Sequence, residues 1–273
     1  MTAGRTVLLV VALAAAGPAC LRNRTDPTAA ARAALKSVQY ARRSFQSSLA
    51  GCSDPTSQAP APCVRIEVEY VEATRSTVEL ARAIAGFVGA TVLRPIGEGG
   101  PLPNVEALRD ELYDLYRARQ AAFPDYRIPW QLTRTVSVAC NTPHVQGLVA
   151  AEHSFTGGAN PVERVDYGSF DTITGARVGV DTLVAPEYRD AFAAEVERRF
   201  REARHIPPGQ GLAAAGFEFP GGRFAATGNL LVCPDALTFR WNRGDVAPGV
   251  FGATDVVVPR ADIQALLRGE AAF

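Results

Sequence analysis

The sequence predicts an α+β fold, in which antiparallel strands carry helices packed on one face and the chain divides into two lobes. Three observations predict it. A long hairpin pattern covers residues 148–180, two amphipathic helical segments lie between residues 76 and 122, and the chain from residue 217 onward is rich in short strand patterns. Helices packed on mainly antiparallel strands define the α+β class.

The composition is that of a folded globular chain. Of its 273 residues, 47% are hydrophobic and 21% are charged, and this length allows one or two domains with full-sized cores. The formal net charge is zero. A balanced charge gives no reason to expect nucleic acid or an acidic lipid surface as a partner.

The first residues carry the pattern of a bacterial export signal. Arg5 precedes an apolar run from Val7 to Ala16, which is too short to cross a bilayer and has the length of a signal-peptide core. Gly-Pro-Ala-Cys follows and resembles a lipobox, although Gly17 stands where leucine is usual. An ordinary secretory signal with a chance cysteine is the alternative to Cys20 as a lipidated residue.

These signals predict where the protein resides. Residues 1–19 are expected to be a signal peptide, Cys20 the lipid attachment site and residues 20–34 a tether. The remainder is then extracytoplasmic and anchored in the cell envelope. Leu21 stands where an aspartate often retains lipoproteins at the inner membrane, so the outer membrane is expected if the cell has one.

The cysteines agree with export. Without Cys20, an even number remains, and in an oxidising compartment that number suggests two disulfides. Three pairings are open, and the favoured one joins Cys52 to Cys63 across a short proline-containing loop and Cys140 to Cys233. A zinc site is the weaker alternative, because no Cys-x-x-Cys spacing is present and the three histidines lie far apart. No metal or other cofactor is expected.

The first lobe is expected over residues 35–100. Strand patterns cover residues 36–47 and 64–74 and form a hairpin. A helix follows, where Ser76 and Glu79 match the capping box that satisfies the free amides of a helix start.

The second lobe is expected over residues 101–273. Asn104 is placed to cap its first helix, and residues 130–140 show the cleanest strand alternation in the chain. The central hairpin follows, with strands at residues 148–155 and 163–171.

The end of the chain is expected to hold one more helix and several strands. Pro186 suits the first turn of this helix, and a solvated helix end is favoured over an anion-binding patch for the arginines from Arg198 to Arg204. The expected strands are residues 217–219, 224–232, 236–241 and 254–258.

No catalytic set stands out. Glu152 and His153 are adjacent in a strand and therefore point to opposite faces, so they are not expected to act as one acid–base unit. His153 falls on the more apolar side with Phe155, which favours a core histidine. Three aspartates are further candidates: Asp166, Asp171 and Asp181. Turn-forming or solvated roles are favoured for each over a catalytic or cation-binding role. The chain has no serine elbow and no His-Glu-x-x-His motif.

Three segments resemble the C-terminal extracytoplasmic domain of RsiV-type proteins. They are TGGAN at residues 156–160, DTITGARVGVDTLV at residues 171–184 and LTFRWNRGDVAPGVFGATDVVVP at residues 237–259. The likeness covers residues 130–267, and the hairpin and helix before it are similar to the smaller domain that often precedes this one.

The chain departs from the family pattern at three positions. Asn160 stands where histidine often closes the Gly-Gly-Ala turn, and Gly244 and Gly249 stand where tyrosines are common. In this family one branch is an anti-sigma factor whose outer domain binds lysozyme, and another is fused to a polysaccharide deacetylase. Many other members are lipoproteins without a known role, and this chain looks like one of these.

The resemblance and the residues together predict a non-enzymatic, lipid-anchored envelope protein that binds a lysozyme-like protein or cell-wall glycan (peptidoglycan). The alternatives are a peptidoglycan-acting hydrolase or deacetylase and a structural envelope scaffold. Binding is expected in loops at one end of the domain, through Gly157, Gly158, Asn160, Asn242 and Asp245.

Overall fold

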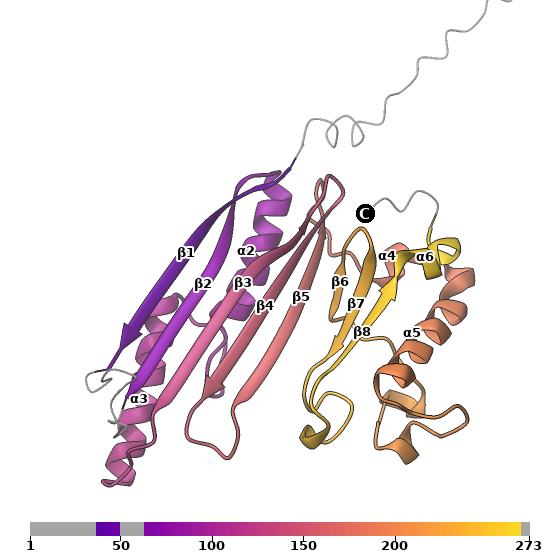
Figure 1. Cartoon of the computed structure of the whole chain (residues 1–273). Helices are drawn as coiled ribbons and strands as arrows, with labels where there is room; N and C mark the ends of the chain where they lie inside the picture. The colour runs from indigo at the N-terminus through magenta and orange to yellow at the C-terminus, as the bar shows by residue number, and fades with distance from the viewer. Residues whose placement is uncertain (1–36, 50–62, 269–273) are drawn as a thin grey trace, which may run out of the picture.

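The computed structural model of the chain describes residues 37–49 and 63–268. They form a five-stranded sheet in the order β1-β2-β3-β4-β5 and a three-stranded sheet in the order β6-β7-β8 (Figure 1). The first sheet consists of β1 (Gln39–Ser48), β2 (Val64–Arg75), β3 (Trp130–Asn141), β4 (Val145–Phe155) and β5 (Val162–Asp171). The second consists of β6 (Leu230–Val232), β7 (Ala236–Trp241) and β8 (Thr254–Pro259).

Helices and short turns complete the architecture and confirm the α+β class. The α-helices are α2 (Val78–Val92), α3 (Val105–Ala122), α4 (Val180–Leu183), α5 (Arg189–Ala203) and α6 (Arg260–Ile263). Short 3-10 turns lie at Pro186–Tyr188, Ala213–Ala215, Pro220–Gly222, Gly249–Phe251 and Gln264–Leu266.

One strand pairing differs from the prediction that the strands are antiparallel. β2 and β3 run parallel, with Val64 opposite Trp130 and Glu69 opposite Thr135, whereas the other paired strands are antiparallel. The reason is the connection between them. Parallel strands need a long crossover, and α2 and α3 together return the chain from the end of β2 to the level where β2 began.

The first core lies between the five-stranded sheet and the pair α2 and α3, which cover the same face of that sheet (Figure 1). Alternate side chains of β2 are buried against these helices, whereas Arg65 of β2 and Gln131 of the neighbouring β3 are exposed on the other face. The main contributors from the helices are Leu80, Ile84, Val88, Val92, Leu108 and Leu112.

The helix starts follow from local capping chemistry. Asn104 caps α3 as predicted, since its Oδ1 accepts a hydrogen bond from Ala107 N at 2.8 Å. The predicted capping box of Ser76 and Glu79 is wrong by one residue. Thr77 is the cap of α2, because its hydroxyl accepts a hydrogen bond from Leu80 N at 3.2 Å.

The second core lies between α5 and the three-stranded sheet. Phe192, Val196 and Phe200 recur every four residues of α5 and are buried there. The strand predicted at residues 217–219 is not present, and only Leu230–Val232 of the predicted 224–232 strand pairs with a neighbour. The phenylalanines in these segments fill the core instead, with Phe217, Phe219 and Phe224 packed around Phe200 at centroid distances of 5.2–5.6 Å.

The two hydrophobic clusters meet along β4 and β5. The first cluster holds buried residues from Val38 to Phe170, and the second holds Val145 together with buried residues from Leu183 to Leu267. The predicted division between residues 100 and 101 falls between α2 and α3, and both helices contribute to the first cluster.

A disulfide joins the two sheets. Cys140 in β3 is bonded to Cys233, which follows β6, with 5.7 Å between the two Cα atoms, and this confirms the predicted pairing. Cys63 is disulfide-bonded as well, while Cys52 and Cys20 lie outside the described residues, as do the predicted signal peptide and tether.

We predict that replacing both Cys140 and Cys233 by serine lowers the free energy of unfolding by about 4.6 kcal/mol. The bond closes a loop with a sequence separation of 93 residues, and on the chain-entropy model such a cross-link restricts the unfolded chain by about this amount. Urea denaturation of the native and double-variant proteins measures the change. A loss below about 1 kcal/mol contradicts a constraining role for this bond.

Candidate functional site

The outer edge of β5 is held by two asparagine side chains from the second sheet. Asn242 Oδ1 accepts a hydrogen bond from Val165 N at 2.9 Å, and Asn242 Nδ2 donates to Val165 O at 3.0 Å. Asn229 Nδ2 donates to the same carbonyl at 2.8 Å, and Asn229 Oδ1 accepts from Tyr167 N at 2.6 Å. The two side-chain amides therefore satisfy Val165 N, Val165 O and Tyr167 N, which no neighbouring strand pairs.

Asn242 and Asp245, both predicted as binding residues, form the turn that follows β7. Asn242 N donates to Asp245 Oδ2 at 2.7 Å, and Arg240 Nε donates to Asn242 Oδ1 at 3.2 Å. Asn242 is buried. The side-chain amide of Asn242 therefore holds the β7–β8 loop against β5 and positions that loop.

The predicted glycines lie in the β4–β5 turn, and they differ in their surroundings. Gly157 has φ +78°, and a Cβ there would lie 1.7 Å from Tyr126 Oη, which accepts a hydrogen bond from Trp130 Nε1 at 2.8 Å. Gly157 is therefore required by packing. A Cβ on Gly158 would make only an ordinary contact, 3.9 Å from Asn160 O, and both Gly158 and Asn160 are exposed to solvent.

Several exposed apolar side chains belong to loops at this end of the molecule. The β4–β5 turn, the β7–β8 loop and the connection after α3 lie at the same end of the sheets (Figure 1). Five large side chains in or beside them are 41–87% exposed, and we call this set the apolar tip: Phe123, Ile128, Val162, Val250 and Phe251. The sequence predicts binding at two of these loops but does not single out these side chains, although each of them follows or precedes a proline or glycine.

Arg204 fixes the β7–β8 part of the tip. It follows α5, and its guanidinium donates to Thr254 Oγ1 at 2.6 Å, to Phe251 O at 2.9 Å and to Ala253 O at 3.0 Å. The ring of Phe251 also packs on Phe217, with 5.3 Å between centroids. The backbone of the loop is held, and Val250, which is 87% exposed, projects from it.

The other arginines near the end of α5 have partners within the protein. Arg198 pairs with Glu195 and Glu202, and Arg201 pairs with Glu197 at 2.7 Å. Hydrogen bonds from Arg198 lower the pKa of the Glu195 carboxyl. These ion pairs on the helix surface fit the solvated helix end that the sequence predicts.

A charged cluster lies between α2 and β3–β5. Arg134 is buried at 3% exposure, and its Nε lies 3.0 Å from Glu152 Oε2. Its Nη1 donates to the carbonyl of Val92 at 2.9 Å and to that of Arg94, just beyond the end of α2. A buried charge requires partners of this kind, and here they hold the helix end onto the sheet.

Asp166 extends this cluster toward the open surface. Its Oδ2 lies 2.6 Å from Arg94 Nη2 and 2.9 Å from Arg164 Nε. Burial raises the pKa of the Asp166 carboxyl. Hydrogen bonds from Arg164 and Arg94 lower this pKa by more than burial raises it, so the pKa lies below its usual value of 3.8.

The prediction that His153 is a core residue is wrong. Its side chain is 46% exposed, and its Nδ1 lies 3.8 Å from Glu163 Oε1 on the open face of the sheet. The Glu152 side chain lies on the helix-covered face of the sheet with Leu148 and Ala150, because buried Arg134 needs a carboxylate partner there. The two neighbours do point to opposite faces, so they form no acid–base pair.

The three aspartates do not converge. Asp166 belongs to the charged cluster, Asp171 Oδ1 accepts a hydrogen bond from Thr174 N at 2.8 Å in a turn, and Asp181 pairs with Arg189 at 2.8 Å. Within residues 37–49 and 63–268, no group of three or more His, Cys, Asp or Glu side chains is arranged to hold a metal ion. None of the helices in these ranges has the length and hydropathy of a membrane span.

Comparisons with known proteins give a family match and a fold. Residues 181–261 match the family model described as "Protein of unknown function (DUF3298)". A DUF3298 family member from Bacteroides fragilis has a similar structure, with TM-score 0.62 and 16% identity over 85% of this chain and 94% of that one. One from Pseudomonas aeruginosa gives TM-score 0.61 and 12% identity over the same shares.

At these identities the likeness establishes the fold alone, which supports the α+β assignment. No curated protein sequence matches this chain significantly. The finer assignment to the RsiV type stays a prediction.

We predict that Asn242→Ala lowers the free energy of unfolding by about 1–3 kcal/mol, because Val165 N loses a partner in a part-buried position. Urea denaturation measures the loss. Asn160→Ala is the matched control, since this residue is exposed and its replacement is expected to change stability by less than about 0.5 kcal/mol. Equal effects of the two substitutions contradict the role given to Asn242.

The Asp166 carboxyl predicts a pH dependence. Its pKa is lower in the folded protein than in the unfolded chain, so its stabilisation is fully present above the usual value of 3.8 and is lost as pH falls through the lowered value. The difference in unfolding free energy between the native protein and Asp166→Asn is therefore expected to be larger at pH 5 than at pH 2. Urea denaturation at both pH values measures it, and a pH-independent difference contradicts the assignment.

Proposed function

We propose that this chain is an extracytoplasmic protein, anchored through a lipid on Cys20, that binds a lysozyme-like protein through the apolar tip. The observation that carries the proposal is the exposure of large apolar side chains on loops at one end of the fold. Exposed apolar surface, where it is contiguous, marks sites of interaction with a partner.

The chemistry of the tip favours a protein over a glycan. Ile128, Val162 and Val250 have side chains without hydrogen-bonding groups, whereas the hydroxyls of a glycan need polar partners when they are desolvated. Apolar and aromatic side chains on a rigid support are typical of the energetic centre of protein interfaces. Phe251, which Arg204 and Phe217 hold in place, is a suitable anchor of this kind.

Two further features support the extracytoplasmic location. The Cys140–Cys233 disulfide is of the type that persists in oxidising compartments. The lipobox-like sequence that ends at Cys20 supplies an anchor. The resemblance to RsiV-type proteins supplies c-type lysozyme as the first partner to test.

We predict saturable binding of c-type lysozyme to the soluble chain of residues 21–273, measured by calorimetric titration, with purified peptidoglycan titrated in parallel. Val250→Asp is expected to weaken lysozyme binding at least about tenfold, because it places a charge at the interface centre. Val257→Asp is the matched control, since Val257 is 54% exposed but lies in β8 and outside the tip.

Three outcomes contradict the proposal. Peptidoglycan binding without lysozyme binding indicates a glycan-binding protein. Absence of binding to either one excludes a lysozyme-like partner. Equal weakening by the two valine substitutions places the interface away from the tip.

A further inference from the structure

One edge of the five-stranded sheet is open among the residues that the structure describes. β1 forms the outer border of the sheet and pairs only with β2 (Figure 1). Leu49 N donates to Val64 O at 2.9 Å, and in an antiparallel pair the direction of the backbone groups alternates from residue to residue. The N–H and C=O groups at the even positions of β1 therefore point away from β2, and we call these the outward residues: Tyr40, Arg42, Ser44, Gln46 and Ser48.

Two other sheet edges are protected, whereas this one is not. Asn229 and Asn242 satisfy the edge of β5. The edge of β8 is short, since that strand has six residues, and it ends in Pro259, which has no N–H. β1 has ten residues and contains neither proline nor glycine. A long edge of this kind pairs readily with another strand, so β1 is suited to a partner.

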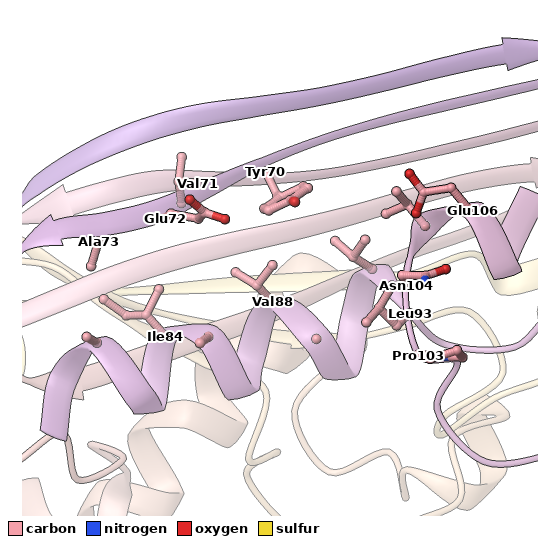
Figure 2. A pocket seen from close by; sticks show the side chains of 15 residues that line it. Tyr70, Val71, Glu72, Ala73, Ile84, Val88, Leu93, Pro103, Asn104 and Glu106 are labelled. Atoms are coloured by element: carbon pink, nitrogen blue, oxygen red, sulfur yellow. The ribbon is translucent and has the colours of Figure 1, made fainter. Parts of the chain in front are cut away.

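The charges of β1 do not close this edge. Arg43 is held against its own sheet, because its Nε donates to Glu72 Oε2 at 2.8 Å. Figure 2 shows Glu72 on the wall of a groove of about 630 Å³ between α2 and β2. Arg42 is the other charged residue of β1. A partner strand therefore has to keep positive charge away from these two arginines.

The sequence of β1 is complementary to itself. When two copies run antiparallel with Ser44 opposite Ser44, every outward residue of one copy lies opposite an outward residue of the other. Tyr40 then lies opposite Ser48, and Arg42 lies opposite Gln46. Any other two-fold register leaves at least one outward residue without a partner.

The same register keeps like charges apart. Arg42 faces the neutral Gln46 of the second copy, and Arg43 faces the ring of Phe45. A two-fold register centred on Arg42 or Arg43 instead places two arginines directly opposite each other, which is destabilising. Full pairing and compatible charges therefore select one register.

We propose that the edge of β1 is a dimer interface, in which β1 of two copies of this chain pair antiparallel with Ser44 opposite Ser44. The two copies are related by a two-fold axis, so the same strand serves both and the assembly closes at a dimer. The two five-stranded sheets become one continuous sheet, with α2 and α3 of both copies on the same side.

The dimer leaves the apolar tips accessible. β1 ends at the end of the sheet where the β4–β5 turn lies (Figure 1). Because the two copies of β1 run in opposite directions, the two tips lie at opposite ends of the dimer. The interface depends neither on the proposed lysozyme-like partner nor on the lipid, and it is tested without either.

Analytical ultracentrifugation of the soluble chain of residues 21–273 tests for the dimer. We expect a monomer–dimer equilibrium with a dissociation constant of about 100 µM or lower. Ser44→Pro removes an outward N–H at the centre of the interface, where an edge strand tolerates proline, and is expected to weaken dimerisation at least about tenfold. Val257→Pro is the matched control, because the N–H of Val257 also points away from its sheet, at the β8 edge. Circular dichroism confirms that both variants fold.

Cysteine cross-linking tests the register without removing a backbone group. In Ser44→Cys the two new thiols lie opposite each other, with Cα atoms about 5.5 Å apart, which is within the range of a disulfide. Gln46→Cys is the matched control, since its two thiols lie four residues out of register, about 13 Å apart. Mild oxidation is expected to link Ser44→Cys into a covalent dimer at least about tenfold faster than Gln46→Cys, measured by mass spectrometry of the non-reduced protein.

Three results overturn the proposal. A native chain that sediments as a monomer up to about 500 µM has no such interface. A dimer that the two proline substitutions weaken equally, or that neither weakens, pairs through another surface. Equal cross-linking of Ser44→Cys and Gln46→Cys excludes the register centred on Ser44.

Discussion

The outer edge of β5 is the junction on which the rest of the structure depends. An edge strand exposes unpaired backbone groups, and here Asn229 and Asn242 satisfy them with side-chain amides from the second sheet. Ser169 continues the junction, because its hydroxyl accepts a hydrogen bond from Val232 N at 2.8 Å. The Cys140–Cys233 disulfide ties the same two sheets covalently. The two sheets, whose hydrophobic clusters meet along β4 and β5, are joined by these contacts.

This junction decides what the loops at the end of the molecule can do. The β4–β5 turn belongs to the first sheet and the β7–β8 loop to the second, so their relative position depends on β5. Asn242 attaches the β7–β8 loop to Val165, and Arg204 holds the same loop from α5. A surface built from both loops is then preorganised, which reduces the cost of ordering it when a partner binds.

Local patterns in the sequence predict most elements, because periodicity and caps act over a few residues. Asn104, the β4–β5 hairpin and the Phe192–Val196–Phe200 stripe are examples. Features decided by distant contacts were missed. The face taken by His153 depends on buried Arg134 in the neighbouring strand, and the irregular 217–219 segment depends on the ring of Phe200. For the candidate site, the sequence predicts the two loops. It does not predict that the Asn242 side chain points inward and bonds to Val165, because these two residues are far apart in the sequence.

The most direct test of the account is whether the two sheets unfold together. The chain has two tryptophans, Trp130 in the first core and Trp241 in the second. The variants Trp130→Phe and Trp241→Phe each leave one of them as a fluorescence probe for urea denaturation, with circular dichroism as the common reference. The account predicts that, within each variant, the tryptophan and circular dichroism transitions coincide. A tryptophan transition that separates from the circular dichroism curve, with one core melting before the other, contradicts a single unit joined through β5.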